Sequence, residues 1–363
     1  WPFSSEHVDN YGSSLIDLAV YYETQILGRK VFLDYTKNPS DFNVENLDST
    51  ALIYLNKSNA LEDLPYLRLM ALNEKAFLLY KEKGINLSKE VLEISVCNQH
   101  LNGGITGDIW WESTIKHLFA IGEINGSHGI HRPGGAALNA GQVGGLRTAQ
   151  KIGHSYNKNL KINVSDYLFL IEYQLYDFLN NFSEVIFNPS NPTSKPLKLV
   201  EILEQIQNRM EKYGGIIRIE KELEREIEII DNLFKNFNSF IRLDSNLDII
   251  PYLRIRDCLL TQLMFFHAIN DYHKLFGQSR GSYLIIRENL NAKLNEHFIL
   301  LPSKLNQFKF IKSNNDLSNQ IQTIYFKDSK MNVKWVKVRE IPNNFGWFEN
   351  VWKDFANDRI YKK

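Results

Sequence analysis

Apolar residues recur at helical spacing in several long stretches, so that each stretch has one face suited to a buried core. In residues 220–237, for example, Leu223, Ile227, Ile230 and Phe234 share a face. The charges on the rest of that stretch alternate in sign, which favours a solvated face over a binding surface. The pattern predicts helices over residues 14–27, 63–83, 164–182, 197–213, 220–237 and 252–276.

Glycine marks the expected ends of several of these helices. Gly28 and Gly84 follow the first two helices, and Gly214-Gly215 ends the fourth. Glycine is the residue most often found just past a helix end, because it tolerates a positive φ angle. Asp63 is the expected N-terminal cap of the second helix.

Shorter stretches favour extended structure. Residues 30–36 are predicted to form a strand closed by Asn38-Pro39, and residues 85–96 also turn extended. Residues 117–123, HLFAIGE, are predicted to form a short apolar strand. Residues 321–340 alternate apolar and polar around a tight turn, which predicts a hairpin. An aromatic cluster follows, comprising Phe345, Trp347, Phe348, Trp352 and, near the end, Tyr361.

These elements predict an α+β multidomain protein with four parts. An α/β piece is followed by a glycine-rich ligand-binding piece, a helical bundle and a small C-terminal β-hairpin region. The expected boundaries are 1–95, 96–155, 156–300 and 301–363.

Composition narrows the classes of function. The 42 Lys and Arg residues balance 42 Asp and Glu residues, which removes the usual electrostatic case for binding nucleic acid or an anionic membrane. No apolar run is long enough to span a bilayer. The two cysteines, Cys97 and Cys258, lie far apart, so this chain alone makes no iron–sulfur or structural zinc cluster, and a cytoplasmic protein is expected. The sequence starts at Trp1 without a signal-peptide pattern, so we expect a fragment or one half of a larger polypeptide.

Glycine is crowded into residues 98–147, where two histidines and an arginine precede a Gly-Gly pair and a predicted helix. Glycine lets backbone approach a ligand closely, and a helix start offers unpaired N–H groups. The alternative is a set of ordinary glycine turns in a core. Polar side chains that could converge on a ligand here are Gln99, His100, Glu123, His128, His131 and Arg132.

Two of these side chains suit particular ligand groups. Glu123 ends the predicted strand, where a carboxylate can hold ribose hydroxyls, or else cap local N–H groups. The rigid guanidinium fork of Arg132 suits a carboxylate or a developing oxyanion, or else a structural ion pair. The histidines are too few for a metal site, and His267 and His273 favour core or surface positions over metal ligation.

Several ordered motifs resemble one flavoprotein family. HLFAIGE followed by HGIHRPGGAAL, and the preceding NGGITGD, resemble segments of the succinate dehydrogenase, fumarate reductase and L-aspartate oxidase superfamily. GRKVFLDYTKNP resembles part of that family's capping domain. LEQIQNRMEKYGGIIRIEKELE and LRIRDCLLTQLMFFHAI with SRGSYL resemble passages of its helical domain. Order and spacing hold from about residue 1 to 290.

The resemblance implies part of a capping domain, then the second FAD-contacting segment of the flavoprotein, then its helical domain. It implies hydride transfer between FAD and a small carboxylate substrate. Arg132, His100 and Gln99 are the expected catalytic residues. The expected cofactor-binding residues are Gly103, Gly104, Gly122, Glu123, His128, Gly134, Gly135, Ala137 and Leu138.

The sequence also departs from this family. No strand–GxGxxG–helix segment is present, Gln99 stands where the family has a histidine, and QSRG replaces ESRG. Expected partners are therefore an N-terminal FAD-binding half, in the same or a separate chain, and an electron-transfer partner such as an iron–sulfur subunit, through which the protein could be peripheral to a membrane. The alternatives are a non-catalytic interaction module, one half of a split enzyme, or a helical protein with coincidental glycine turns.

Overall fold

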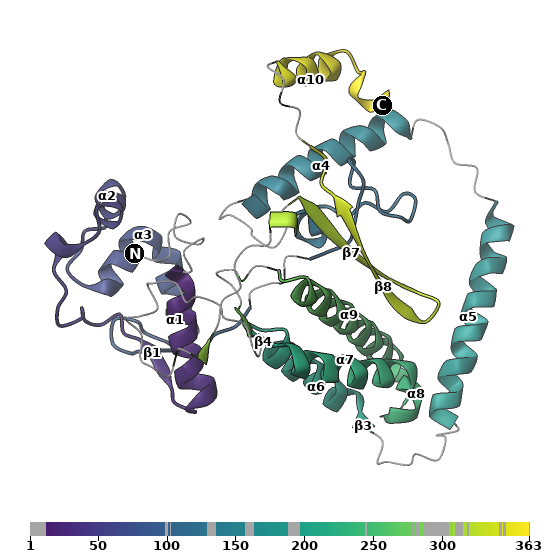
Figure 1. Ribbon diagram of the computed structural model, residues 1–363, viewed down its shortest axis with the longest axis horizontal. Coiled ribbons are helices and arrows are strands. Elements are labelled where there is room, and N and C mark those ends of the chain that lie inside the picture. The colour runs from purple at the N-terminus through teal and green to yellow at the C-terminus, as the bar shows by residue number, and fades with distance from the viewer. Residues whose placement is uncertain are drawn as a thin grey trace. The chain divides into compact units, whose positions relative to one another are not determined.

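The computed structural model is mostly helical and divides into two compact units (Figure 1). One contains residues 1–97, 280–282 and 293–308, and the other contains 98–279, 283–292 and 309–363. Their boundary near residue 97 is a feature of the structure, whereas the four-part division stays a prediction. The structure describes residues 12–98, 101, 103–128, 136–156, 163–187, 197–243, 245–277, 279, 284–286, 305, 307–308, 315–317, 319–340, 343 and 346–362.

In the described part of the first unit, three α-helices accompany a two-stranded antiparallel sheet in which Val31 pairs with Ile94. Two of its helices are followed by glycine as predicted, since Gly28 has a φ of 64° and Gly84 a φ of 87°. Its elements are α1 (Gly12–Tyr21) with a π-helical turn (Tyr22–Ile26), β1 (Val31–Leu33), α2 (Ser49–Lys57), α3 (Pro65–Glu82) and β2 (Leu92–Ile94). The strands are shorter than the predicted extended stretches.

Asp63 does not cap α3, which corrects the sequence prediction. The cap position is Leu64, without a side-chain hydrogen bond, and Pro65 occupies the first helical turn, where its missing N–H costs nothing. Helix α3 is kinked at Asn73, whose φ of −158° is not helical. Asn73 Oδ1 accepts a hydrogen bond from the Ala76 N–H at 3.1 Å, so the side chain caps the second half of the helix.

The second unit contains the helices α4 (Ala136–Ser155), α5 (Val164–Phe187), α6 (Leu199–Tyr213), α7 (Glu220–Lys235), α8 (Phe237–Phe240), α9 (Ile249–Lys274) and α10 (Trp347–Ala356). Its strands are β3 (Leu197–Lys198), β4 (Ile217–Ile219), β5 (Ile241–Arg242), β6 (Leu284–Ile286), β7 (Gln320–Lys327) and β8 (Lys330–Lys337). β3 pairs with β5 and β4 with β6, both parallel. Helix α10 was not predicted. None of the helices in the described part of the chain is long and apolar enough to cross a membrane.

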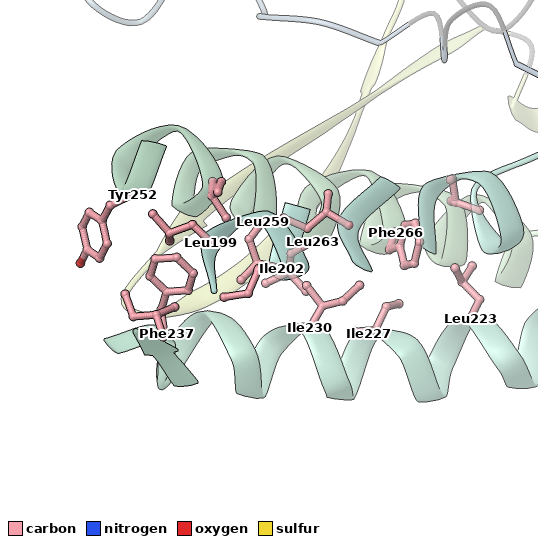
Figure 2. Close-up of a cluster of buried hydrophobic side chains, with 14 of the residues drawn as sticks. Leu199, Ile202, Leu223, Ile227, Ile230, Phe237, Tyr252, Leu259, Leu263 and Phe266 are labelled. Carbon is pink, nitrogen blue, oxygen red and sulfur yellow. The ribbon is translucent and has the colours of Figure 1, made fainter. Parts of the chain in front are cut away.

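Helices α6, α7 and α9 pack around one hydrophobic cluster (Figure 2). Leu223 and Ile230 are fully buried and Ile227 is 9% exposed, which confirms the predicted inner face of α7. On α9, Leu259, Leu263 and Phe266 have no exposed surface. These burials account for the strict spacing of apolar residues in the bundle.

The predicted hairpin is present as β7 and β8, joined by Asp328 and Ser329 with φ angles of 51° and 57°. Two positive φ angles are typical of the tight turn that matches the twist of a hairpin. A carboxylate on α9 links the hairpin to this helix through hydrogen bonds. Oδ2 of Asp271 accepts hydrogen bonds from Gln322 Nε2 and Trp335 Nε1, each at 2.8 Å.

Candidate functional site

The predicted strand at 117–123 is not formed, which is a correction. Within it, Phe119 makes only an isolated bridge to Glu112, and residues Gly122–Ile124 form a 3-10 turn. The backbone hydrogen bonds here are local: the Ala120 N–H donates to the Trp111 carbonyl at 3.0 Å, and the Ser113 N–H to the Leu118 carbonyl at 2.8 Å. Within this run, Ala120 is buried in a folded loop, whereas Leu118 is 46% exposed.

Backbone approaches backbone closely at Gly104. A Cβ on Gly104 would lie 2.4 Å from the Ile124 carbonyl oxygen and 2.8 Å from the Gly126 nitrogen. The Ile105 N–H donates to that same Ile124 oxygen at 2.7 Å, and the neighbouring residues form a parallel bridge. The absence of a side chain at position 104 therefore allows segments 103–107 and 122–126 to pack backbone against backbone. Gly103 is similarly confined, since its Cβ would lie 3.0 Å from the ring of Phe265 on α9.

Glycine also brings the start of α4 against this loop. Gly122 has a φ of 77°, and a Cβ on it would lie 3.7 Å from the Cα of Gly141. With no side chain on either residue, the 3-10 turn lies against the helix. The neighbouring Glu123 is thus placed beside the first turns of α4.

A shallow hollow of about 520 Å³ lies at this junction. It is lined by Glu123, Ala137, Leu138, Gly141 and Gln142. Three of these, Glu123, Ala137 and Leu138, are residues for which the sequence predicted cofactor contacts. The Glu123 side chain is exposed, and Leu138 is 69% exposed although it is a large apolar residue. The hollow thus combines an accessible carboxylate with an uncovered apolar wall.

His128 adds a polar atom that lacks a partner. It ends the 3-10 turn Gly126–His128, which contacts α4. Its Nε2 is enclosed and makes no hydrogen bond within the described part of the chain. A buried ring nitrogen without a partner is costly, so it is a feature typical of a ligand contact.

The residues that pack between α4 and the loop were not among the site residues predicted from the sequence. The indole of Trp111 packs on Gly144, and the guanidinium of Arg147 lies 4.8 Å from the Trp110 ring centre and 5.9 Å from that of Trp111. The hydroxyl of Thr148 donates to the Trp110 carbonyl at 2.9 Å. These contacts fix the orientation of the helix. The sequence signal that could have identified these residues is the adjacent pair Trp110-Trp111 within the glycine-rich stretch.

A hydrogen-bonded cluster ties the far end of α4 to the same loop. The Tyr156 hydroxyl lies 2.8 Å from His117 Nδ1 and donates to Glu112 Oε1 at 3.4 Å. Desolvation and the neighbouring Glu112 carboxylate raise the pKa of Tyr156. The hydroxyl therefore stays protonated near neutral pH and serves as a donor.

The remaining predicted site residues lie outside the described residues: Gln99, His100, His131, Arg132, Gly134 and Gly135. Their roles stay predictions. Within the described ranges, no group of three or more His, Cys, Asp or Glu side chains gathers to hold a metal ion.

Comparison with known proteins identifies distant relatives. The chain is 26% identical over 161 residues to one of the subunits of the fumarate reductase (CoM/CoB) of Methanothermobacter marburgensis, covering 44% of this chain and 27% of the relative. It is 28% identical over 182 residues to an FAD-dependent oxidoreductase of Methanocaldococcus jannaschii, covering 49% and 30%. To L-aspartate oxidase of Clostridium acetobutylicum it is 28% identical over 124 residues, covering 31% and 29%. No family model matches the chain.

The fold agrees with these similarities. A solved quinol–fumarate reductase with menaquinol molecules aligns with a TM-score of 0.56 and 16% identity, covering 90% of this chain and 49% of that one. The chain is distantly similar to part of the fumarate reductase, succinate dehydrogenase and L-aspartate oxidase flavoproteins. This confirms the resemblance found in the sequence motifs. The chain spans less than a third of the length of the three curated relatives named above.

Proposed function

We propose that this chain is part of an FAD-dependent oxidoreductase and that residues 98–147 form its second FAD-contacting segment. The activity would be hydride transfer between the flavin and a carbon beside a carboxylate of a small substrate. The observation that carries the proposal is the hollow at Glu123, Ala137 and Leu138, because residues chosen by family resemblance line one surface. The relationship to FAD-dependent oxidoreductases supports it.

The described residues fit such a cofactor in three respects. Gly104 and Gly122 allow close backbone packing in the loop, and Leu138 and Asn139 in the first turn of α4 are exposed. Leu138 presents an uncovered apolar side chain, suited to a flat ring. His128 holds an enclosed ring nitrogen without a partner among these residues. FAD would supply the ring that accepts or donates hydride.

Each residue would then have a distinct task. The Glu123 carboxylate would accept hydrogen bonds from ribose hydroxyls. Ala137 and Leu138 would exclude water from the ring, and His128 Nε2 would hydrogen-bond a polar edge. Arg132, with Gln99 or His100, would bind the substrate carboxylate and stabilise negative charge that develops during the reaction.

The assignment of the hollow to FAD can be tested with two substitutions on α4, one of which is a matched control. Leu138→Glu puts a charge into the proposed contact, and we expect the native protein to lose most of its flavin. Val143→Glu is the control, because Val143 is 54% exposed on the same helix but does not line the hollow. Equal flavin content in the two variants would contradict the assignment of the hollow.

The substrate side is tested by Arg132→Ala. We expect activity with a carboxylate substrate to fall far more than flavin content, since the guanidinium acts on the substrate. Equal loss of both would assign Arg132 to the cofactor or to the fold instead.

We also propose that the protein acts with an N-terminal FAD-binding half, in the same or a separate chain, and with an electron-transfer partner such as an iron–sulfur subunit. The fumarate reductase (CoM/CoB) relative is itself named as a subunit, which supports assembly with other chains. A fumarate- or succinate-like carboxylate is the proposed substrate class.

The alternative is a non-catalytic interaction module. It is favoured by α5, where Phe169, Tyr173 and Tyr176 are 70%, 68% and 70% exposed. The coding frame upstream of Trp1 distinguishes the two. A continuing frame with GxGxxG favours the enzyme, whereas a nearby start codon favours the module or a split enzyme.

A further inference from the structure

A second hollow in the larger unit is lined only by residues outside the glycine-rich segment 98–147. Its volume is about 600 Å³, within the range of roughly 300–1,000 Å³ typical of small-molecule sites. It is formed by residues of α5, the end of α7, Asn236, α8 and the start of α9. The lining residues are Tyr173, Gln174, Phe178, Phe234, Lys235, Asn236, Phe237, Asn238, Ser239, Tyr252, Leu253 and Arg256.

Two buried aromatic rings, Tyr252 and Phe237, form the floor of this groove, and packing holds them in place. Tyr252 and Phe237 are 5% and 3% exposed and lie at the end of the hydrophobic cluster opposite Leu223 (Figure 2). Their ring centres are 5.4 Å apart, and Tyr252 also meets Phe182 edge to face at 5.3 Å. The Tyr252 hydroxyl lies 2.8 Å from Asn238 Oδ1 and donates to it. The floor is therefore rigid before any ligand arrives, which lowers the entropic cost of binding.

Arg256 supplies a cation at the groove. Its guanidinium carbon lies 5.3 Å from the centre of the Phe234 ring, and that ring meets Phe326 of β7 edge to face at 5.5 Å. Stacking on an anchored ring orients the guanidinium and leaves its N–H edge for another partner. Arg256 is exposed, and within the described ranges no carboxylate forms an ion pair with it.

The positively charged side chains that line the groove favour an anionic ligand. The lining contains the two cations Arg256 and Lys235 and no Asp or Glu. Lys235 is already paired, since its Nζ lies 2.5 Å from Asp231 Oδ2. Arg256 is thus the cation left to meet an anion, and its planar fork matches a carboxylate with two parallel hydrogen bonds.

We propose that this groove binds a small aromatic carboxylate. The aromatic body would pack among Tyr173, Phe178 and Phe237, and the carboxylate would accept hydrogen bonds from Arg256. This inference is independent of the flavin proposal, because it rests on other residues and on a different ligand.

The test is calorimetric titration of the purified native protein with 2-naphthoate and with the uncharged 2-naphthamide. We expect naphthoate to bind more tightly than the amide. In Arg256→Gln, naphthoate should bind about tenfold more weakly while the amide is little changed, because one charge-assisted pair is lost. Arg254→Gln is the matched control, because Arg254 is an exposed arginine on the same helix outside the lining.

Three results would each overturn the proposal. They are no binding of naphthoate, equal binding of naphthoate and naphthamide, or equal loss in Arg256→Gln and Arg254→Gln. The Arg256→Gln protein should keep the far-ultraviolet circular dichroism of the parent chain, since the side chain is exposed.

Discussion

Gly104→Ala should destabilise the glycine-rich loop strongly, because the added methyl group has only backbone around it. Its Cβ would lie 2.4 Å from the Ile124 oxygen, where 3.4 Å begins ordinary contact. The two segments must separate by about 1 Å, which costs about 1–3 kcal/mol as overpacking. The 2.7 Å hydrogen bond from Ile105 N–H to that oxygen is also stretched, at about 0.5–1.5 kcal/mol. We expect a total loss of roughly 2–4 kcal/mol.

The assay is urea unfolding followed by tryptophan fluorescence, since Trp110 and Trp111 lie within this same loop. Gly145→Ala on α4 is the control. Its Cβ would meet only Ile121 Cγ2, at 3.9 Å, so the helix should gain about 0.5–1 kcal/mol. A Gly104→Ala protein within about 0.5 kcal/mol of the parent would refute the close packing described here.

Further predictions concern other parts of the fold. Asp271→Ala removes the acceptor of two hairpin hydrogen bonds, so hydrogen exchange should accelerate across β7 and β8 and stability should fall by about 1–3 kcal/mol. Unchanged exchange in the hairpin would show that the carboxylate does not fasten it. Burial raises the pKa of Asp17 from 3.8 to about 6, so the folded state retains this proton and stability falls as pH rises through that interval. Asp17→Asn should flatten this fall in the pH dependence of thermal unfolding; an unaltered profile would contradict it.

The hydrophobic pattern predicted the bundle well because burial there is periodic. Ile202 and Ile206 of α6 are 1% and 6% exposed, as their spacing requires. The pattern failed at residues 117–123, where an apolar run serves a folded loop whose hydrogen bonds are local. Helix α10 was also missed, although Phe348, Val351, Trp352 and Phe355 recur there at helical spacing, because its aromatic residues were interpreted only as a cluster.

The candidate sites were predictable to different degrees. Glu123, Ala137 and Leu138 were chosen from ordered motifs, and the structure brings them to one hollow because Gly122 packs against Gly141. The groove at Arg256 could not be predicted. It depends on how α5, α7 and α9 pack against one another, and the spacing of residues within one segment does not indicate such packing.

The central claim is that residues 98–147 contact FAD, and the flavin content of the native protein tests it most directly. We predict that the protein, purified with its FAD-binding half, shows the visible absorbance bands of oxidised flavin and loses them selectively in Leu138→Glu. A native preparation that is colourless, and stays colourless after incubation with FAD, would contradict the claim.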